Sequence, residues 1–496
     1  MRIKKVSICI FIMLLTITIL PCYANENTKN TSMNNEINES KNNLIFMDQT
    51  RNDASYDMVI ITPEKFSNSL QKLINHKQLY GIATYTKTTE DIYQNYPGRD
   101  NPEKIKYFIK DALETKNIQY VLLIGNKETL PVRYATIYFD EDLTNNNHYH
   151  FPFFQSASSE NHLEFISDLY YADIYDQYHD FSTWDSNNNN VFAEANSMKL
   201  IDTVDLYPDV AVGRLLCDTT DELDTIINKI IKYETNTYDS SWFKNLILLG
   251  GDTHTNIDLE KNIISLAPVD AEIAWEGEYM CELVAETLPL FQAKKYYASG
   301  ILRTDVQRLS TNNINQAMNQ GAGFIFFGLH GNVDLVATHF PYLQRSIIPF
   351  PKGYQTNEIN LLSNAEKLSV AVLPACYCGD FNTVDSPFAW KLISHPMGGA
   401  IISYAITTEG LYWPSTLAAQ SLSGYTAMIV FKAYADGIDI SGDIWDETIT
   451  RYLNDDEAIA IGNMNYQAPM YYNNFALESW ILFGDPSLKI GGYPPN

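Results

Sequence analysis

Positive charge is scarce in this sequence. Its 496 residues include 34 Lys and Arg against 60 Asp and Glu, so the formal net charge is −26 at pH 7. A protein this acidic repels phosphate backbones and anionic membrane surfaces, so nucleic acid and acidic lipids are not expected as partners. Cationic segments of other proteins and divalent cations are the partners that this charge favours.

Cysteine is also scarce, with six in the whole chain. Two of them, Cys9 and Cys22, lie in the N-terminal leader, and the others are Cys217, Cys281, Cys376 and Cys378. Four cysteines do not make a disulfide scaffold in a chain of this length. Cys217 and Cys281 could pair, and the sequence leaves their redox state open. Cys376 and Cys378 are two positions apart, which strains a disulfide and does not match a zinc-binding CxxC pair.

Long apolar runs are absent after the N-terminus. Basic residues precede the apolar run Val6–Leu20, and Cys22-Tyr23-Ala24 offers a small-residue cleavage site. Residues 1–24 therefore have the pattern of a signal peptide, although an uncleaved anchor helix would look similar. We expect a secreted protein that does not insert into a membrane once the signal is removed. Residues 25–54 are rich in Asn, Glu, Ser and Lys and are expected to form a disordered leader.

The remaining chain alternates short apolar strands with amphipathic helices, which indicates an α/β fold with mainly parallel sheets. In residues 55–238 we expect strands at Met58–Thr62 and Tyr120–Gly125, with a helix over about 101–116 between them. An irregular, Asn- and Asp-rich insert follows from about 134 to 205. A second α/β unit, residues 239–496, begins with the strand Asn245–Gly251. The length exceeds that of one core, so two adjacent subdomains are expected.

Two apolar stretches end at reactive side chains. Phe324–Gly331 (FIFFGLHG) reaches His330, and Ser369–Asp380 (SVAVLPACYCGD) reaches Cys376. Buried parallel strands have such continuous apolar sequences, and working groups of open α/β sheets lie past the carboxyl ends of the strands. The two stretches therefore predict a Cys–His dyad. Gly331 lets a backbone N–H face the substrate, as an oxyanion hole formed with the N–H of Cys376 requires.

Four stretches resemble the gingipain family of secreted cysteine peptidases. Ala375–Phe381 (ACYCGDF) is similar to the family's nucleophile segment, and Phe326–Gly331 is similar to its strand ending in His-Gly. Pro208–Arg214 (PDVAVGR) and Phe483–Leu488 (FGDPSL) are further marks of the family. The resemblance implies a caspase-like three-layer αβα fold and a cysteine endopeptidase. It makes Cys376 the nucleophile and His330 the base, with protein or peptide substrates and no organic cofactor.

The resemblance implies further residues of the site. Asp252, past the strand Leu246–Gly251, would orient His330. Trp413 would form the aromatic wall of the S1 pocket. The best-known members cut after Arg or Lys and use a carboxylate at the floor of S1, for which Glu276, with Glu278 nearby, is the candidate here. A basic P1 residue is therefore expected.

The Asn-rich insert suggests a calcium site. Asp185, Asn187, Asn189, Val191 and Glu194 place oxygen ligands at alternate positions of a loop that a glutamate closes. The spacing is like that of an EF-hand loop, although the usual Gly is missing and Glu194 comes two positions early. Asp168 and Asp173 could add ligands. A solvated Asn-rich loop is the other interpretation.

Two other functions fit the same residues. A transpeptidase, or processing peptidase, would pass the acyl group from Cys376 to an amine instead of water. A non-enzymatic binding protein could use an inactivated peptidase scaffold, but such a scaffold has no chemical need for both His330 and Cys376. The sequence does not determine the oligomeric state.

Overall fold

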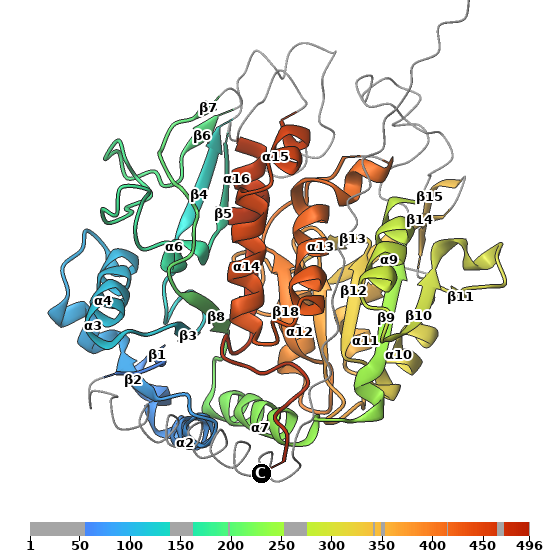
Figure 1. Cartoon of the computed structure of the whole chain (residues 1–496), viewed down its shortest axis with the longest axis horizontal. Coiled ribbons are helices and arrows are strands. Elements are labelled where there is room, and N and C mark those ends of the chain that lie inside the picture. The colour runs from blue at the N-terminus through green and yellow to red at the C-terminus, as the bar shows by residue number, and fades with distance from the viewer. Residues whose placement is uncertain are drawn as a thin grey trace, which may run out of the picture. The chain divides into compact units, whose positions relative to one another are not determined.

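The computed structural model describes residues 55–138, 162–196, 199–251, 275–340, 343–348, 353–413, 415–463 and 471–495. The leader segments 1–24 and 25–54 lie outside this part of the chain. Within it, one large sheet contains the strands β1 (Met58–Thr62), β2 (Thr84–Thr88), β3 (Tyr120–Ile124), β8 (Ala211–Leu215), β9 (Asn245–Gly250), β10 (Gln292–Tyr297), β11 (Gln307–Arg308), β12 (Phe324–Gly328), β17 (Ser369–Leu373), β18 (Ala400–Ile406) and β19 (Trp480–Phe483). Their spatial order is β11-β10-β9-β12-β17-β18-β19-β8-β3-β1-β2, from right to left in Figure 1.

Helices cover both faces of this sheet. One layer consists of α2 (Gln71–Leu79), α7 (Thr220–Asn236), α12 (Phe388–Ser394), α11 (Thr356–Ile359) and α10 (Thr311–Gln320), packed in that succession. The other contains α9 (Glu276–Thr287), α13 (Leu422–Ala435), α14 (Ser441–Leu453) and α16 (Tyr471–Glu478). Alternate side chains of β12 contact the two layers: Phe326 meets Phe431 of α13, and Phe327 meets Phe388 of α12. The expected three-layer αβα architecture is confirmed.

Local sequence explains where helices begin and end. The helix α4 (Asn101–Lys116) starts after Asp100, whose carboxylate accepts the Glu103 N–H at 2.9 Å, and Pro102 occupies its first turn. Asn117 ends it in the left-handed conformation with φ of 59°. In α7 the cap is the hydroxyl of Thr219. Next to α4 lie α3 (Thr89–Asn95) and α6 (Leu169–Ala172), and α15 (Asp456–Gly462) follows α14.

The last strand, β19, joins the two parts of the chain into one sheet. It runs antiparallel to β18 and parallel to β8, and every other pairing in the large sheet is parallel. In the large sheet, the strands from residues 55–238 therefore run antiparallel to the others except β19. The first group is β1, β2, β3 and β8, and the second is β9, β10, β11, β12, β17 and β18. Two smaller sheets lie beside the large one. The first contains β13 (His330–Asn332), β14 (Leu335–Phe340), β15 (Leu343–Ile348) and β16 (Tyr354–Gln355), and the second contains β4 (Tyr134–Tyr138), β5 (His162–Ile166), β6 (Ala195–Asn196) and β7 (Lys199–Leu200).

Two of the family-like stretches hold this architecture together. Asp485 of the FGDPSL stretch follows β19 and forms a fully buried ion pair with Lys77 of α2 at 2.8 Å. Lys77 also pairs with Glu234 of α7 at 2.9 Å, which links the C-terminal turn to two helices. Arg214 of the PDVAVGR stretch is buried in β8 and pairs with Asp168 at 2.6 Å. Among the described residues no helix is long and apolar enough to cross a membrane.

Candidate active site

Adjacent parallel strands deliver His330 and Cys376 to the same sheet edge. In the register of β12 and β17, Phe326 lies beside Val372, and His330 and Cys376 are each four residues further on. Both strands are fully buried because their side chains face helix layers on either side. The apolar runs thus end where the backbone leaves the sheet, so His330 and Cys376 lie at the same edge of it.

Gly331 fixes how closely the two segments approach. A Cβ atom built on Gly331 would lie 2.5 Å from the Cys376 carbonyl oxygen and 2.7 Å from the Cys378 sulfur. Any side chain at position 331 would therefore push the histidine segment away from the nucleophile turn, Ala375–Asp380. The glycine that the sequence suggested for an oxyanion hole is also required by packing.

The two neighbouring thiols have different environments. Cys376 is half-buried, whereas Cys378 is fully buried, with its sulfur 3.7 Å from the carbonyl oxygen of Asn332. Burial also raises the pKa of the Cys378 thiol well above its ordinary value. Cys376 is therefore the more exposed cysteine of this pair.

Backbone N–H groups surround the sulfur of Cys376. The N–H of Gly410 donates to it at 3.3 Å, and the amides of Gly331 and Cys376 itself also lower the thiol pKa. Burial outweighs them and raises the pKa of Cys376 to about 11. With this pKa the thiol is protonated at neutral pH, so it would need a base to act as a nucleophile.

The nucleophile turn has an unusual backbone. Tyr377, directly after the nucleophile, has a φ of 58°, in the left-handed region that side chains other than Gly and Asn rarely occupy. Its N–H donates to the carbonyl of Thr408 at 2.6 Å, and the N–H of Gly379 donates to Ile406 at 2.8 Å. The segment Ile406–Gly410, which follows β18, thus holds the turn in this conformation.

The two residues expected in the S1 pocket are connected through Ser415. Glu276 is buried at the start of α9, and its carboxylate accepts the N–H of Ser415 at 3.1 Å, two residues after Trp413. Trp413 is half-buried against the core. Glu278, the other acidic residue nearby, instead accepts the N–H and the hydroxyl of Ser299 at 2.8 and 2.6 Å. Of these two glutamates, Glu276 is therefore the one that binds the segment following Trp413.

Two other expectations concern Asp252 and a disulfide between Cys217 and Cys281. Asp252 lies outside the described residues, which end at Gly251 in this part of the chain. Cys217 and Cys281 do not form the disulfide that the sequence left open, because both are free thiols. Both are buried in the core, where they act as small apolar side chains.

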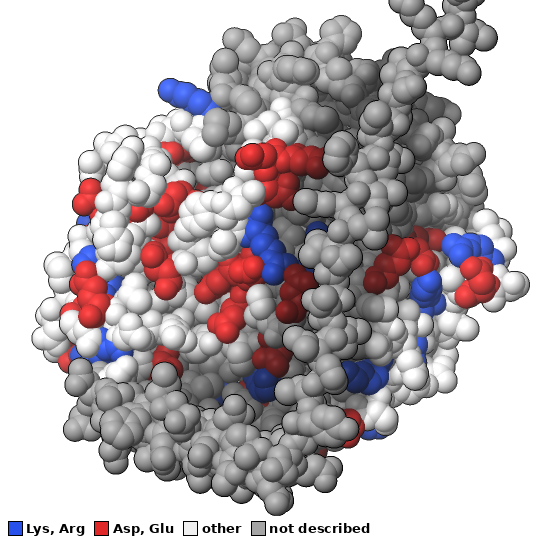
Figure 2. Space-filling model, in the orientation of Figure 1, with Lys and Arg blue, Asp and Glu red and all other residues white. Residues whose placement is uncertain are grey.

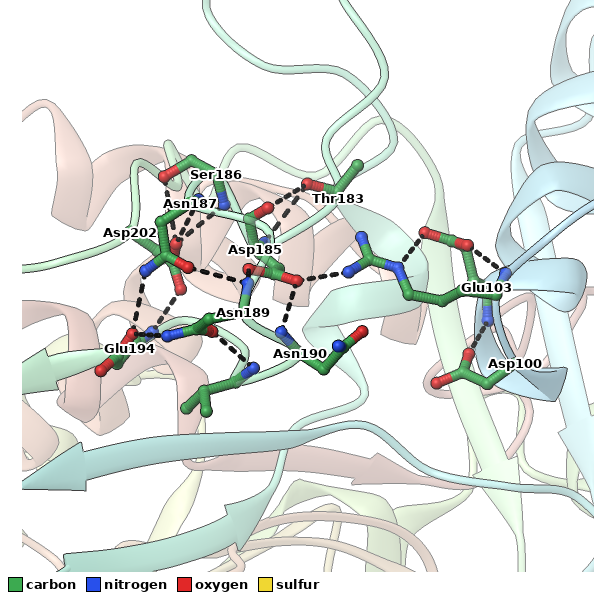
Figure 3. A network of polar contacts seen from close by, with 12 residues as sticks. Asp100, Glu103, Thr183, Asp185, Ser186, Asn187, Asn189, Asn190, Glu194 and Asp202 are labelled. Atoms are coloured by element: carbon green, nitrogen blue, oxygen red, sulfur yellow. Dashed lines mark hydrogen bonds and ion pairs between the residues drawn. The ribbon is translucent and has the colours of Figure 1, made fainter.

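Within the Asn-rich insert, residues 185–194 form a loop with converging oxygen atoms (Figure 3). Asp185 accepts the N–H of Asn189 at 3.0 Å, and the side-chain amides of Asn187 and Asn189 both donate to Glu194, at 3.0 and 2.8 Å. Asn190 stands at the sixth position, where an EF-hand has Gly, and its φ of 66° is one that Asn tolerates. The missing Gly therefore does not prevent the turn.

Two residues outside the loop, which the sequence pattern did not suggest, bind to it. The guanidinium of Arg99 forms an ion pair with Asp185, and Asp202 accepts the N–H of Ser186 at 2.8 Å. Asp168 binds the guanidinium of Arg214, and Asp173 accepts the indole N–H of Trp184, the residue before the loop, at 2.7 Å. Among the described residues no three His, Cys, Asp or Glu side chains group as metal ligands, so a cation here would depend on Asn oxygens and backbone carbonyls such as that of Val191.

The most informative residues that sequence reasoning missed lie after β18. Gly410 supplies an N–H to the Cys376 sulfur, and Glu409 is a buried acid beside the nucleophile turn. β18 lies next to β17 in the sheet, so its carboxyl end reaches the same edge. The signal was available: an acidic residue and a glycine follow a buried apolar strand.

The chain thus places a half-buried thiol at one strand end, with backbone N–H groups around it, and a histidine at the next strand end of a caspase-like α/β fold. The sequence profile of peptidase family C25 matches residues 51–491. The chain belongs to this family.

The relatives that match are distant. Gingipain R2 of Porphyromonas gingivalis is 21% identical over 453 residues, covering 88% of this chain and 46% of gingipain R2. The chain thus spans about half the length of this curated relative. An uncharacterised protein of Archaeoglobus fulgidus is 23% identical over 382 residues, covering 72% of this chain and 78% of that protein.

Solved structures share the fold. The crystal structure of the Arg-specific cysteine proteinase gingipain R has a TM-score of 0.55 at 17% identity, covering 89% of this chain and 79% of that one. The complex of the P. gingivalis RgpB pro- and mature domains has a TM-score of 0.54 at 18% identity, covering 88% and 79%. The similarity extends over nearly the whole described chain.

Proposed function

We propose that the chain is a secreted cysteine endopeptidase with Cys376 and His330 as its dyad. The observation that carries the proposal is the half-buried thiol of Cys376, which receives backbone N–H groups beside the His-Gly pair of β13. Membership of a peptidase family supports protein or peptide substrates. The apolar N-terminal run supports secretion.

The proposed reaction has two stages. His330 takes the Cys376 proton as the sulfur attacks the scissile carbonyl carbon, and the N–H groups of Gly331 and Cys376 stabilise the oxyanion. His330 then gives this proton to the leaving amine, and a thioester remains. In the second stage His330 removes a proton from water, which attacks the thioester and releases the acid and the free thiol. If Asp252 contributes, it orients His330.

We propose a basic P1 residue, recognised by Glu276 beside Trp413. The proposal is supported by the carboxylate of Glu276, which accepts the N–H of Ser415, two residues after Trp413, and the described part of the face in Figure 2 carries several groups of acidic side chains. The similarity to a gingipain whose structure is named as Arg-specific points the same way. The test is release of fluorophore from peptide amides that differ only at P1. Faster cleavage after an uncharged residue than after Arg or Lys would contradict the assignment.

Glu276→Gln is expected to lower kcat/KM for Arg and Lys peptides by about 100-fold, because an unpaired cation in a buried pocket loses several kcal/mol. Peptides with an uncharged P1 should change much less. Glu278→Gln is the matched control, because this buried glutamate of the same helix binds Ser299. Equal losses in the two variants would show a packing effect and remove Glu276 from the specificity pocket.

We also propose that the loop 185–194 binds a structural calcium ion. Glu194 would provide a carboxylate, with Asp185, the side-chain oxygens of Asn187 and Asn189, and the backbone carbonyl of Val191 as further ligands. Adding calcium at about 100 times its Kd should stabilise the chain by about 2.7 kcal/mol, and EDTA should reverse this. The measurement is the unfolding temperature with and without calcium. In Glu194→Gln the calcium-dependent difference should shrink, whereas a wild type that unfolds at one temperature in both conditions would exclude the site.

A further inference from the structure

Glu409 is a buried acid next to the nucleophile turn. Its side chain is 5% exposed, and one carboxylate oxygen accepts the hydroxyl of Tyr377 at 3.2 Å. The other oxygen is buried and has no hydrogen-bond partner among the described residues. Burial raises the pKa of Glu409 to about 7, which the hydrogen bond from Tyr377 lowers only in part. A carboxyl in this state changes its charge near neutral pH.

The segment that carries Glu409 also touches the nucleophile. On one side of Glu409 the carbonyl of Thr408 accepts the N–H of Tyr377, and on the other side the N–H of Gly410 donates to the Cys376 sulfur. The side chain of Glu409 binds the hydroxyl of the same tyrosine. Backbone and side-chain contacts therefore connect three consecutive residues of this segment to Cys376 and Tyr377.

The titratable groups around the Cys376 thiol differ in the pH at which they ionise. Those that interact with it electrostatically in the described residues are Tyr377, Cys378, Glu409 and Tyr412. Burial raises the pKa of Tyr377, Cys378 and Tyr412 far enough that all three stay neutral around pH 7. Glu409 is therefore the group of this set whose charge changes near pH 7, and His330 lies at the end of the adjacent strand.

We propose that Glu409 is a positioning residue of the peptidase site: it holds Tyr377 and the Gly410 N–H in place at Cys376, and its negative charge opposes formation of the thiolate. The inference rests on the proposed function, in which Cys376 is the nucleophile. Two acids so close cannot both ionise as easily as either alone, so their titrations are coupled. As the pH rises through 7, ionisation of Glu409 makes the Cys376 proton harder to remove, and the dependence on His330 increases.

The test is the pH dependence of alkylation of Cys376 by iodoacetamide, followed by mass spectrometry of its peptide between pH 5 and 11. Glu409→Gln keeps the shape and an acceptor for Tyr377 but removes the charge. Its alkylation midpoint should fall by about one pH unit, so that alkylation near pH 7 becomes about tenfold faster. Glu478→Gln is the matched control, since Glu478 is also a buried glutamate of raised pKa but faces Asp173 and Asp202. Its profile should equal that of the wild type.

A second variant separates charge from position. Glu409→Asp keeps the charge on a shorter side chain, so the alkylation midpoint should stay high while peptide cleavage falls as the contact with Tyr377 is lost. An unchanged midpoint in Glu409→Gln, or equal shifts in the Gln and Asp variants, would overturn the inference. So would a loss of cleavage confined to peptides with a basic P1, which would place Glu409 in the substrate pocket.

The outcome is distinguishable from failure of the proposed function. If Cys376→Ala abolishes cleavage while Glu409→Gln leaves the alkylation profile unchanged, the dyad stands and the role of Glu409 is wrong. If Cys376→Ala still cleaves, the proposed peptidase mechanism is wrong. The alkylation measurement does not depend on knowing the substrate.

Discussion

Alanine at position 376 is expected to reduce kcat/KM for the preferred peptide amide by about 10⁴- to 10⁶-fold. Removal of a covalent nucleophile has this effect because the remaining oxyanion donors and binding contacts recover only a small part of the rate. Cys376 is the half-buried thiol of the turn, and the N–H of Gly410 is directed at its sulfur. The measurement is fluorophore release by the purified chain in the presence of a thiol reductant, with stopped-time assays long enough to detect the residual rate.

Cys378→Ala is the matched control. Its sulfur is fully buried, so the substitution should remove packing without removing the reacting group, and kcat/KM should stay within about tenfold of the wild type. Alkylation of the wild type should modify Cys376 and leave Cys378 unmodified. Loss of activity in Cys378→Ala alone would show that the nucleophile has been assigned two residues too early.

Arg214→Met is expected to lower the free energy of unfolding by about 3–5 kcal/mol, because it leaves a carboxylate buried without its partner. Both guanidinium contacts to Asp168 are short, at 2.6 and 2.8 Å, and Arg214 is fully buried in β8. Arg214 also donates to the carbonyls of Gly125 and Leu130, at 3.4 and 3.2 Å, which lose their partner as well. Urea unfolding followed by tryptophan fluorescence measures the loss.

Two further variants make this prediction specific. Adding Asp168→Leu to Arg214→Met removes the isolated charge and should recover part of the lost stability. Lys232→Met breaks an exposed ion pair with Glu366, whose side chains are 58% and 47% exposed, and should cost less than about 1 kcal/mol. A loss as small for Arg214→Met as for Lys232→Met would mean that the PDVAVGR stretch does not hold the sheet through this ion pair.

Much of the fold could be predicted from local sequence. The strand Met58–Thr62 and the helix 101–116 were predicted with the bounds that the structure has, because an apolar run and a capped helix are local patterns. The position of β19 was not predictable in this way. A four-residue apolar run does not reveal that it lies between β18 and β8, antiparallel to one and parallel to the other. That arrangement depends on residues far apart in the chain.

The candidate site likewise has features that local sequence predicts and features that depend on tertiary contacts. His330 and Cys376 could be found because each follows a buried apolar strand, and the structure places these strands side by side. The role of Asp252 stays a prediction, since it lies outside the described residues. Asp168 was considered as a further ligand of the loop 185–194, and the structure shows its carboxylate bound to Arg214 of β8. Sequence proximity did not predict the partner of a buried charge.

The sequence by itself determined the α/β class, the strand ends that carry the histidine and the thiol, and the resemblance to the gingipains. These follow from hydrophobic periodicity and short motifs, which are properties of neighbouring residues. Only the tertiary structure decided that Cys376 is more exposed than Cys378, that Glu276 binds Ser415 just after Trp413, and that Glu409 and Gly410 lie against the nucleophile turn. Burial, charge and hydrogen bonding at a site depend on which strands become neighbours, and that is settled when the whole sheet forms.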